Sequence, residues 1–331
     1  MIKNLADKVM NGKYLSLAEL QELVREIRNK RVDDLQFVSF LAALETRNRI
    51  KGINVEECAN FTRALREPLT TDLEGILCPA GCGGDPIKTI NVSTPVSIIL
   101  ASGGVRVLKN GFKSVTGKCG SREILEAMGI EPFLSLEQTL ESVKSVGIGY
   151  YDFQNLIVME KRSGFRSPLN YIGALSHPIK ISYKLLGCSD KVQFEKMIPI
   201  ANELYEGYLL TFNTEIDEIS TVSQTEIVEK RKNNKSRYLF DPKKIGINQT
   251  NYREVLASQT PEENAERVLR VFNGENSPVS ELLALNAGAG FYIAGKSKSV
   301  EEGYELANQL LSDGSTKCKL DEWRSFIVGL Q

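Results

Sequence analysis

The chain has 331 residues, of which 42% are hydrophobic and 25% charged, and 41 basic and 42 acidic residues leave a formal net charge of −1. This composition is typical of a globular chain with a sizeable core, and the balanced charge gives no general attraction to nucleic acid or to membranes. The sequence holds no apolar run near the roughly 20 residues that a membrane span needs and opens with no signal peptide, so we expect a cytoplasmic protein.

The first 70 residues show helical patterns only. Ser16 followed by Glu19 forms a capping box, which predicts a helix that begins after Ser16. Apolar residues recur at helical spacing from Val32 to Thr46, and a third helix is expected over Val55–Arg66. These patterns predict a small N-terminal helical domain.

From about residue 75 onward, short apolar or β-branched runs alternate with helical patterns. Four runs are expected to be strands, namely Thr89–Val92, Val105–Leu108, Ile148–Tyr151 and Tyr208–Phe212. Helices are expected over Pro95–Gly103, Arg122–Met128, Ala265–Val271 and Val300–Leu311. Strands that alternate with helices predict an α/β domain with a mostly parallel central sheet flanked by helices.

Two loops rich in glycine and hydroxyl groups follow one another in the α/β region. The first reads GCGGDPIKTINVST from Gly81, and the second reads KNGFKSVTGKCGS from Lys109. Glycines let the backbone approach an anion, and polar side chains beside a helix N-terminus add donors. Lysines on the second loop add positive charge. The pair of loops predicts a site for a highly charged phosphorylated sugar.

Neither loop matches a common nucleotide motif. No G-K-[ST] follows the first glycine at the spacing of a Walker A loop. GCGGD also lacks the third glycine of a dinucleotide fingerprint, and no acidic ribose ligand stands at the usual distance.

The two loops resemble those of the anthranilate phosphoribosyltransferase family, which read approximately GTGGD…TFNIST and KHGNRSVSSKSGS. The N-terminal helical region, the sequence IDEIS at 216–220 and NAGAGFYIAG at 286–295 extend this resemblance over almost the entire chain. The resemblance implies the glycosyltransferase family 3 fold. It places a helical domain at 1–70, completed by roughly 165–190, beside an α/β domain at 71–331 that binds 5-phosphoribosyl 1-pyrophosphate (PRPP).

The resemblance also assigns ligand-binding residues. Those expected to bind PRPP come from both loops: Gly81, Gly84, Asp85, Thr89, Asn91, Ser93, Thr94, Lys109, Lys113, Ser114, Thr116, Gly117 and Ser121. Mg²⁺ is expected at Ser93, Asp217 and Glu218, since it prefers a few carboxylates together with substrate phosphates. No protein nucleophile is expected, because an amine of the acceptor attacks the sugar directly, and His177 is expected to be structural.

The chain departs from the family mainly where the acceptor binds. Asn110 and Phe112 stand where the family has the His and Asn of K-H-G-N, and Ala174 replaces a proline. A phenyl ring at Phe112 removes a polar contact from the acceptor pocket. These substitutions favour an aromatic amine or heterocycle other than anthranilate.

The segment that carries the family's anthranilate-binding arginine is also altered. Counting back from Arg166, which aligns with the family, places Glu160 at the position of that arginine, with Lys161 or Arg162 as alternatives. A carboxylate in place of a guanidinium opposes an anionic acceptor. A genuine anthranilate phosphoribosyltransferase of tryptophan biosynthesis stays open, with the carboxylate bound by Lys161 or Arg162.

Two further expectations concern partners. Five cations between Lys230 and Arg237 suggest a nucleic-acid-binding relative as an alternative, although a solvated loop or helix end is the ordinary explanation. The N-terminal helices, with apolar residues Leu35, Phe37, Val38, Phe40 and Leu41, are expected to form a homodimer interface. Six scattered cysteines suit reduced thiols better than a disulfide framework.

Overall fold

The computed structural model describes residues 1–69, 71–111, 119–153, 165, 167–232 and 234–330. The chain divides into two compact units. The smaller unit comprises Met1–Thr70, Gln154–Lys180 and Val192–Leu204, and the larger comprises Thr71–Phe153, Ile181–Lys191 and Tyr205–Gln331. The predicted completion of the helical domain by roughly 165–190 differs from this division, because residues 183–188 form a strand of the larger unit.

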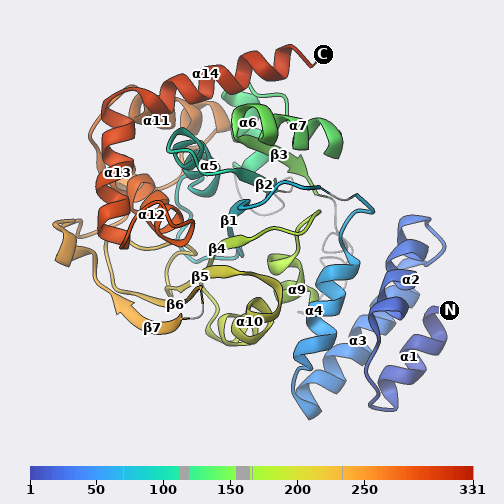
Figure 1. The fold of residues 1–331 in the computed structure, drawn as a ribbon. Helices are drawn as coiled ribbons and strands as arrows, with labels where there is room; N and C mark the ends of the chain where they lie inside the picture. Colours follow the sequence, from blue (N-terminus) through green and yellow to red (C-terminus); the bar gives the residue numbers. More distant parts are fainter. Residues whose placement is uncertain (70, 112–118, 154–164, 166, 233, 331) are drawn as a thin grey trace. The chain divides into compact units, whose positions relative to one another are not determined.

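The smaller unit is helical (Figure 1). Its helices are α1 (Ile2–Met10), α2 (Leu17–Arg28), α3 (Asp34–Lys51), α4 (Val55–Ala64), α9 (Leu169–Leu175) and α10 (Lys191–Leu204), of which Lys191 falls in the larger unit. The predicted capping box is confirmed: the N–H of Glu19 donates to the Ser16 hydroxyl at 3.3 Å, and the N–H of Ser16 donates to the Glu19 carboxylate at 2.8 Å. Helix α3 starts later than predicted, because the Asp33 carboxylate caps it.

The apolar residues of α3 point mostly into the smaller unit. Phe37, Phe40 and Leu41 are fully buried within the chain, whereas Leu35 is 77% exposed. Most of the apolar surface that suggested a homodimer interface is therefore consumed by packing inside the helical unit.

An ion pair between Arg47 of α3 and Glu57 of α4 lies in the interior of this unit, where both side chains are at most 4% exposed. Arg47 also donates to the carbonyl of Lys13 at 2.7 Å, and the backbone N–H of Leu15 donates to the Glu57 carboxylate at 2.7 Å. The pair thus fastens α3 and α4 to the segment that leads into α2.

The larger unit is built on one seven-stranded sheet in the order β3-β2-β1-β4-β5-β6-β7. Its strands are β1 (Leu77–Gly81), β2 (Val107–Gly111), β3 (Ile148–Asp152), β4 (Tyr183–Cys188), β5 (Gly207–Phe212), β6 (Thr225–Arg231) and β7 (Asn234–Phe240). The neighbouring pairs from β3 through β5 are parallel, and β6 and β7 are added antiparallel, which confirms the predicted fold class.

Helices cover the sheet in layers (Figure 1). They are α5 (Ser93–Ser102), α6 (Ser121–Ala127), α7 (Leu136–Val146), α11 (Pro261–Phe272), α12 (Pro278–Ile293), α13 (Val300–Ser312) and α14 (Ser315–Val328), with short 3₁₀ turns at Pro242–Ile245 and Arg253–Val255. Helix α5 packs against β1 and β2, and α12 packs against β4, β5 and α5. The described helices include none that is long and apolar enough to cross a lipid bilayer.

The connections reverse direction at β1. The chain first runs from β1 outward to β2 and β3, and then returns to place β4 and β5 on the other side of β1. In open α/β sheets, ligands bind outside the carboxyl ends of the strands at such a reversal. The ends of β1 and β4, at Gly81 and Cys188, mark this position.

Several sequence predictions need correction. Thr89–Val92 is not a strand: only Thr89 forms an isolated bridge, with Leu256, and the strand of this region is β1. Pro79 disfavours a central strand because it lacks an N–H. It is tolerated because the pairing of β1 with β2 is confined to Leu77↔Val107, while the pairing with β4 runs the full length of β1.

The basic run forms the end of β6, the turn and β7, rather than a loop or helix end. Three of its cations have partners within the larger unit: Lys230 donates to the carbonyl of Tyr205, Arg231 to that of Ser297, and Arg237 to the carboxylate of Glu226. Lys232 and Lys235 are exposed.

The buried ion pair gives a stability prediction. Arg47→Met should destabilise the protein by about 3–5 kcal/mol, because it leaves the Glu57 carboxylate buried without its cation. Arg47→Met combined with Glu57→Gln should recover much of this loss, since the amide still accepts from Leu15.

The measurement is urea unfolding of the single and double variants. Arg49→Met is the matched control, because Arg49 pairs with Glu45 on the same helix but is 70% exposed, and its loss should cost below about 1 kcal/mol. A double variant as unstable as Arg47→Met alone would contradict the prediction.

Candidate functional site

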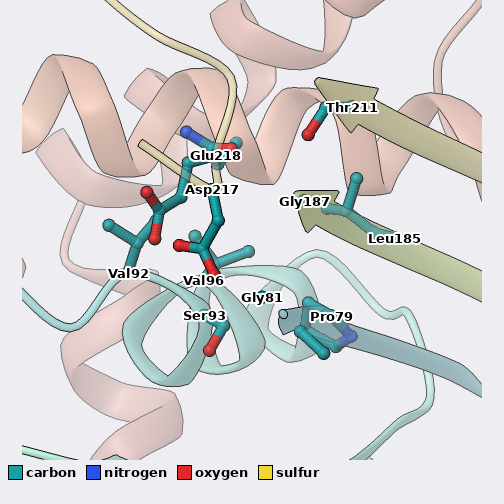
Figure 2. A pocket seen from close by; sticks show the side chains of 12 residues that line it. Pro79, Gly81, Val92, Ser93, Val96, Leu185, Gly187, Thr211, Asp217 and Glu218 are labelled. Atoms are coloured by element: carbon teal, nitrogen blue, oxygen red, sulfur yellow. The ribbon is translucent and has the colours of Figure 1, made fainter. Parts of the chain in front are cut away.

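A pocket lies at the reversal point of the sheet (Figure 2). It is lined by residues from the ends of β1, β4 and β5, the start of α5, the loop after β5 and helix α12: Pro79, Ala80, Gly81, Val92, Ser93, Val96, Leu185, Gly187, Thr211, Asp217, Glu218 and Asn286. The three residues predicted to hold Mg²⁺, Ser93, Asp217 and Glu218, therefore line one pocket.

The acidic pair lies in the loop between β5 and β6, which crosses the ends of β1 and β4. A Cβ atom at position 187 would overlap the backbone carbonyl of Asp217, and one at position 81 would overlap its carboxylate. Because both positions are glycine, the Asp217 residue can lie directly against the carboxyl ends of β1 and β4. The carboxylate comes to rest against the first glycine-rich loop, where the N–H of Gly83 donates to it at 2.6 Å.

The same loop is held from behind by Asn286 of α12. The Asn286 side-chain oxygen accepts from the N–H of Ile219 at 3.0 Å, and its amide nitrogen donates to the carbonyl of Ile219 at 3.1 Å. A further hydrogen bond joins this loop to the first glycine-rich loop: the N–H of Ile87 donates to the carbonyl of Glu215 at 3.0 Å. The positions of Asp217 and Glu218 are thus fixed by backbone contacts on both sides.

Burial dominates the electrostatics of the pair. It raises the pKa of Asp217 to about 6, helped by the negative charge of Asp85 and opposed by the hydrogen bond from Gly83. Burial also raises the pKa of Glu218 well above its ordinary value, and the neighbouring Asp217 adds to the effect. Two adjacent carboxylates that resist ionisation in this way are suited to share a cation.

The start of α5 supplies the opposite side of the pocket. Asn91 stands just before this helix, and its side-chain oxygen accepts from the N–H of Thr94 in the first turn at 3.2 Å. Figure 2 shows the carboxylates of Asp217 and Glu218 on the side of the pocket where Ser93 begins α5.

Two buried oxygens of this region have no hydrogen-bond partner within the described residues, namely the Thr94 hydroxyl and one carboxylate oxygen of Glu218. Buried polar atoms are normally satisfied. Carboxylate oxygens beside hydroxyls are the donor set that Mg²⁺ prefers, so the residues present fit this ion and a phosphate that binds with it.

Two buried cations lie on β2 and β4, the strands on either side of β1. The Lys109 ammonium is buried on β2 and donates to the carbonyl of Asn110 at 2.7 Å. Burial lowers the pKa of Lys109 to about 8, and the nearby charge of Lys184 also lowers it. Lys184 of β4 is fully buried. Within the described residues, the one hydrogen bond of its ammonium group goes to the Cys78 sulfur at 3.6 Å.

The remaining predicted residues fall at several places. Gly84 follows β1, the carboxylate of Asp85 pairs with Lys88 at 2.9 Å, and Thr89 bridges to Leu256. Gly111 and Ser121 approach closely, which brings together the two ends of the second loop. Ala174 is half-buried in α9 of the helical unit. Seven further predicted residues lie outside the described residues: Phe112, Lys113, Ser114, Thr116, Gly117, Glu160 and Arg166.

His177 belongs to the smaller unit and is buried. Its Nδ1 lies 3.2 Å from the carbonyl oxygen of Ile179 and 3.4 Å from the nitrogen of the same residue. These local backbone contacts agree with the structural role expected for it.

Sequence reasoning missed two residues that line the pocket, Gly187 and Asn286, and the buried cation Lys184. Asn286 opens the motif NAGAG, so its signal was present in the sequence but had no assigned role. Gly187 and Lys184 belong to β4, a strand that the sequence analysis did not identify.

The close approach at Gly187 gives a direct test. Gly187→Ala should force the Asp217 backbone away from the sheet edge and weaken ligand binding about tenfold or more, since small displacements in a positioned site are costly. Gly246→Ala is a conformational control, because that glycine has a φ of +85° but open space around its α-carbon. Isothermal titration with PRPP and Mg²⁺ measures the effect, and unchanged affinity in Gly187→Ala would contradict it.

Comparison with known proteins agrees with this site. The α/β domain of the "Glycosyl transferase family" matches residues 74–317, and its helical bundle domain matches residues 3–68. Anthranilate phosphoribosyltransferase of Acetivibrio thermocellus is 32% identical, over 98% of this chain and 96% of that protein. The enzyme of Methanobrevibacter smithii is 30% identical, over 98% of both chains.

Solved structures give the same result. The anthranilate phosphoribosyltransferase of Thermus thermophilus superposes with a TM-score of 0.87 at 27% identity, covering 98% of this chain and 99% of that one. The Saccharomyces cerevisiae enzyme, solved in complex with PRPP and Mg, has a TM-score of 0.83 over 99% of this chain and 98% of that chain; at 19% identity it bears on the fold alone. Together these matches show that the chain belongs to the anthranilate phosphoribosyltransferase family of glycosyltransferase family 3.

Proposed function

We propose that the protein transfers the phosphoribosyl group of PRPP to the amino nitrogen of anthranilate, with Mg²⁺, and releases pyrophosphate. The observation that carries this proposal is the meeting of Asp217, Glu218 and Ser93 in one pocket at the reversal point of the sheet. Relatives that share about 30% of the sequence over nearly its full length are named for this reaction.

The chain's own residues bind and orient rather than react. Ser93, Asp217 and Glu218 would hold Mg²⁺, which when bound stabilises the negative charge that develops on the departing pyrophosphate. The Gly81–Asp85 loop and the start of α5 offer backbone donors and hydroxyls to phosphate oxygens. The Lys109 ammonium, buried on β2, adds positive charge beside them.

No side chain needs to attack the sugar. The acceptor amine displaces pyrophosphate at the anomeric carbon, where the ribose becomes oxocarbenium-like. Holding both substrates in line supplies much of the acceleration, on the order of several kcal/mol. Exclusion of water would prevent hydrolysis of the activated sugar.

An altered acceptor is the second candidate, and it rests on the sequence around β2. Asn110 stands in place of the family's histidine, is buried, and accepts a hydrogen bond from the Cys78 thiol at 3.0 Å. Phe112 and Glu160, which carried the expectation of a different acceptor, lie outside the described residues. The names of the relatives support anthranilate better than this expectation.

Nucleic-acid binding is not proposed. Three cations of the basic run are engaged in contacts inside the larger unit, and the pocket retains the acidic pair that a phosphoribosyl transfer requires. A homodimer through the N-terminal helices stays a prediction, since Phe37, Phe40 and Leu41 are already buried within one chain.

The deciding experiment measures pyrophosphate release and the phosphoribosyl product by mass spectrometry. The acceptors are anthranilate, aniline as its analogue without a carboxylate, and imidazole as a nitrogen heterocycle. We expect turnover with anthranilate and little with aniline. Turnover with aniline or imidazole but not with anthranilate would replace the first candidate by the second.

The acidic pair gives a second prediction. Asp217→Asn combined with Glu218→Gln should lower Mg²⁺-dependent turnover at least about a hundredfold, because the leaving-group charge loses its metal-mediated stabilisation. The unfolding midpoint in Mg²⁺-free buffer should stay equal or rise, since neutral amides replace two buried carboxylates whose ionisation burial opposes.

The matched control removes two negative charges from exposed helix positions, with Glu262→Gln and Glu301→Gln. This variant should keep its turnover. Equal losses in both double variants would show that net charge, rather than the pocket, is responsible.

A further inference from the structure

Two cysteines meet at the reversal point of the sheet. β1 and β4 are paired in register up to Gly81↔Gly187; Cys82 directly follows β1, and Cys188 is the last residue of β4. The contact between the two segments continues past this point, because the N–H of Cys82 donates to the carbonyl of Gly187 at 2.9 Å.

This placement is compatible with a covalent link. Neighbouring strands lie about 4.8 Å apart, and the Cα atoms of a disulfide are usually about 4.4–6.8 Å apart. Cys82 is partly exposed, so that a small oxidant can reach it, whereas Cys188 is buried. Neither of these two cysteines is in a disulfide in the structure.

We propose that Cys82 and Cys188 form an oxidation-sensitive dithiol that closes to a disulfide at the edge of the pocket. With hydrogen peroxide as the oxidant, one of the two sulfurs takes one peroxide oxygen and releases water, which leaves a sulfenic acid. The other thiol then attacks that sulfur, and a second water leaves as the S–S bond forms. The two thiols thereby lose two electrons and two protons, which reduce one peroxide to two waters.

The link acts on the site through the first glycine-rich loop. Cys82 stands between Gly81, which lines the pocket, and Gly83, whose N–H holds the Asp217 carboxylate. A Cys82–Cys188 bond ties this backbone covalently to the end of β4, so the loop that holds Asp217 can no longer adjust when a ligand binds. This consequence for turnover rests on the proposed function.

A threonine has no sulfur and cannot form a disulfide, so Cys82→Thr removes the dithiol while it keeps a small polar side chain in the first glycine-rich loop.

The experiment treats the purified protein with hydrogen peroxide, blocks remaining thiols with iodoacetamide and maps peptides without reduction. We expect a peptide pair joined through Cys82 and Cys188. Turnover of PRPP should fall about tenfold or more in the oxidised protein and return with dithiothreitol, because the positioning loop is tied to β4 and then released.

Cys82→Thr and Cys188→Val should form no such pair and should keep turnover after peroxide, each measured relative to its own reduced form. Cys318→Ser is the matched control, since it removes an exposed thiol elsewhere and should leave the response unchanged. A peroxide-treated protein that carries oxidised Cys318 but no Cys82–Cys188 link would overturn the proposal, and so would a linked protein with full turnover. The peptide map reads the link even if the reduced protein transfers nothing, so failure of the dithiol and failure of the proposed function are distinguishable.

Discussion

The contact between the Asp217 backbone and Gly187 is the constraint on which the pocket depends. The loop that carries the acidic pair crosses the end of β4 where no side chain fits, and its carboxylate rests against Gly81 and the N–H of Gly83. A loop held by such close contacts has few alternative conformations. The distance between the two carboxylates and the start of α5 is therefore fixed before any ligand binds, which is what a positioned site requires.

The same close packing buries ionisable groups that are not paired with one another. Burial opposes the ionisation of Asp217 and Glu218, and one Glu218 oxygen has no partner among the described residues. On β2 and β4, the strands on either side of β1, Lys109 and Lys184 are buried cations without carboxylate partners within the described part of the chain. Buried acidic and basic groups that are not paired with one another destabilise the empty protein. A bound metal ion would compensate the two buried carboxylates, and a bound polyphosphate would compensate the two buried ammonium groups. These residues thus lower the stability of the protein without ligands and favour ligand binding.

Much of the fold followed from local patterns. The Ser16 capping box and the strands at β2, β3 and β5 were predictable because each depends on residues close in sequence. β1 was not predicted because Pro79 argues against a central strand. A proline is tolerated there because β2, which follows later in the chain, pairs with β1 only at Leu77. The run Thr89–Val92 was misassigned because its β-branched residues lead into α5, where the Asn91 side chain accepts from the N–H of Thr94.

The two glycine-rich loops, the acidic pair and the order of a helical domain before an α/β domain could be read from the sequence alone, since each is written in contiguous residues. The folded chain adds that Asp217 lies on Gly187, that Asn286 holds the loop of the acidic pair, and that Cys82 lies beside Cys188. Asn286 and Ile219 are 67 positions apart in the chain, and the two cysteines are farther apart still. The cysteines meet because the chain reverses at β1 and brings β4 beside it, and no local pattern encodes which strands become neighbours.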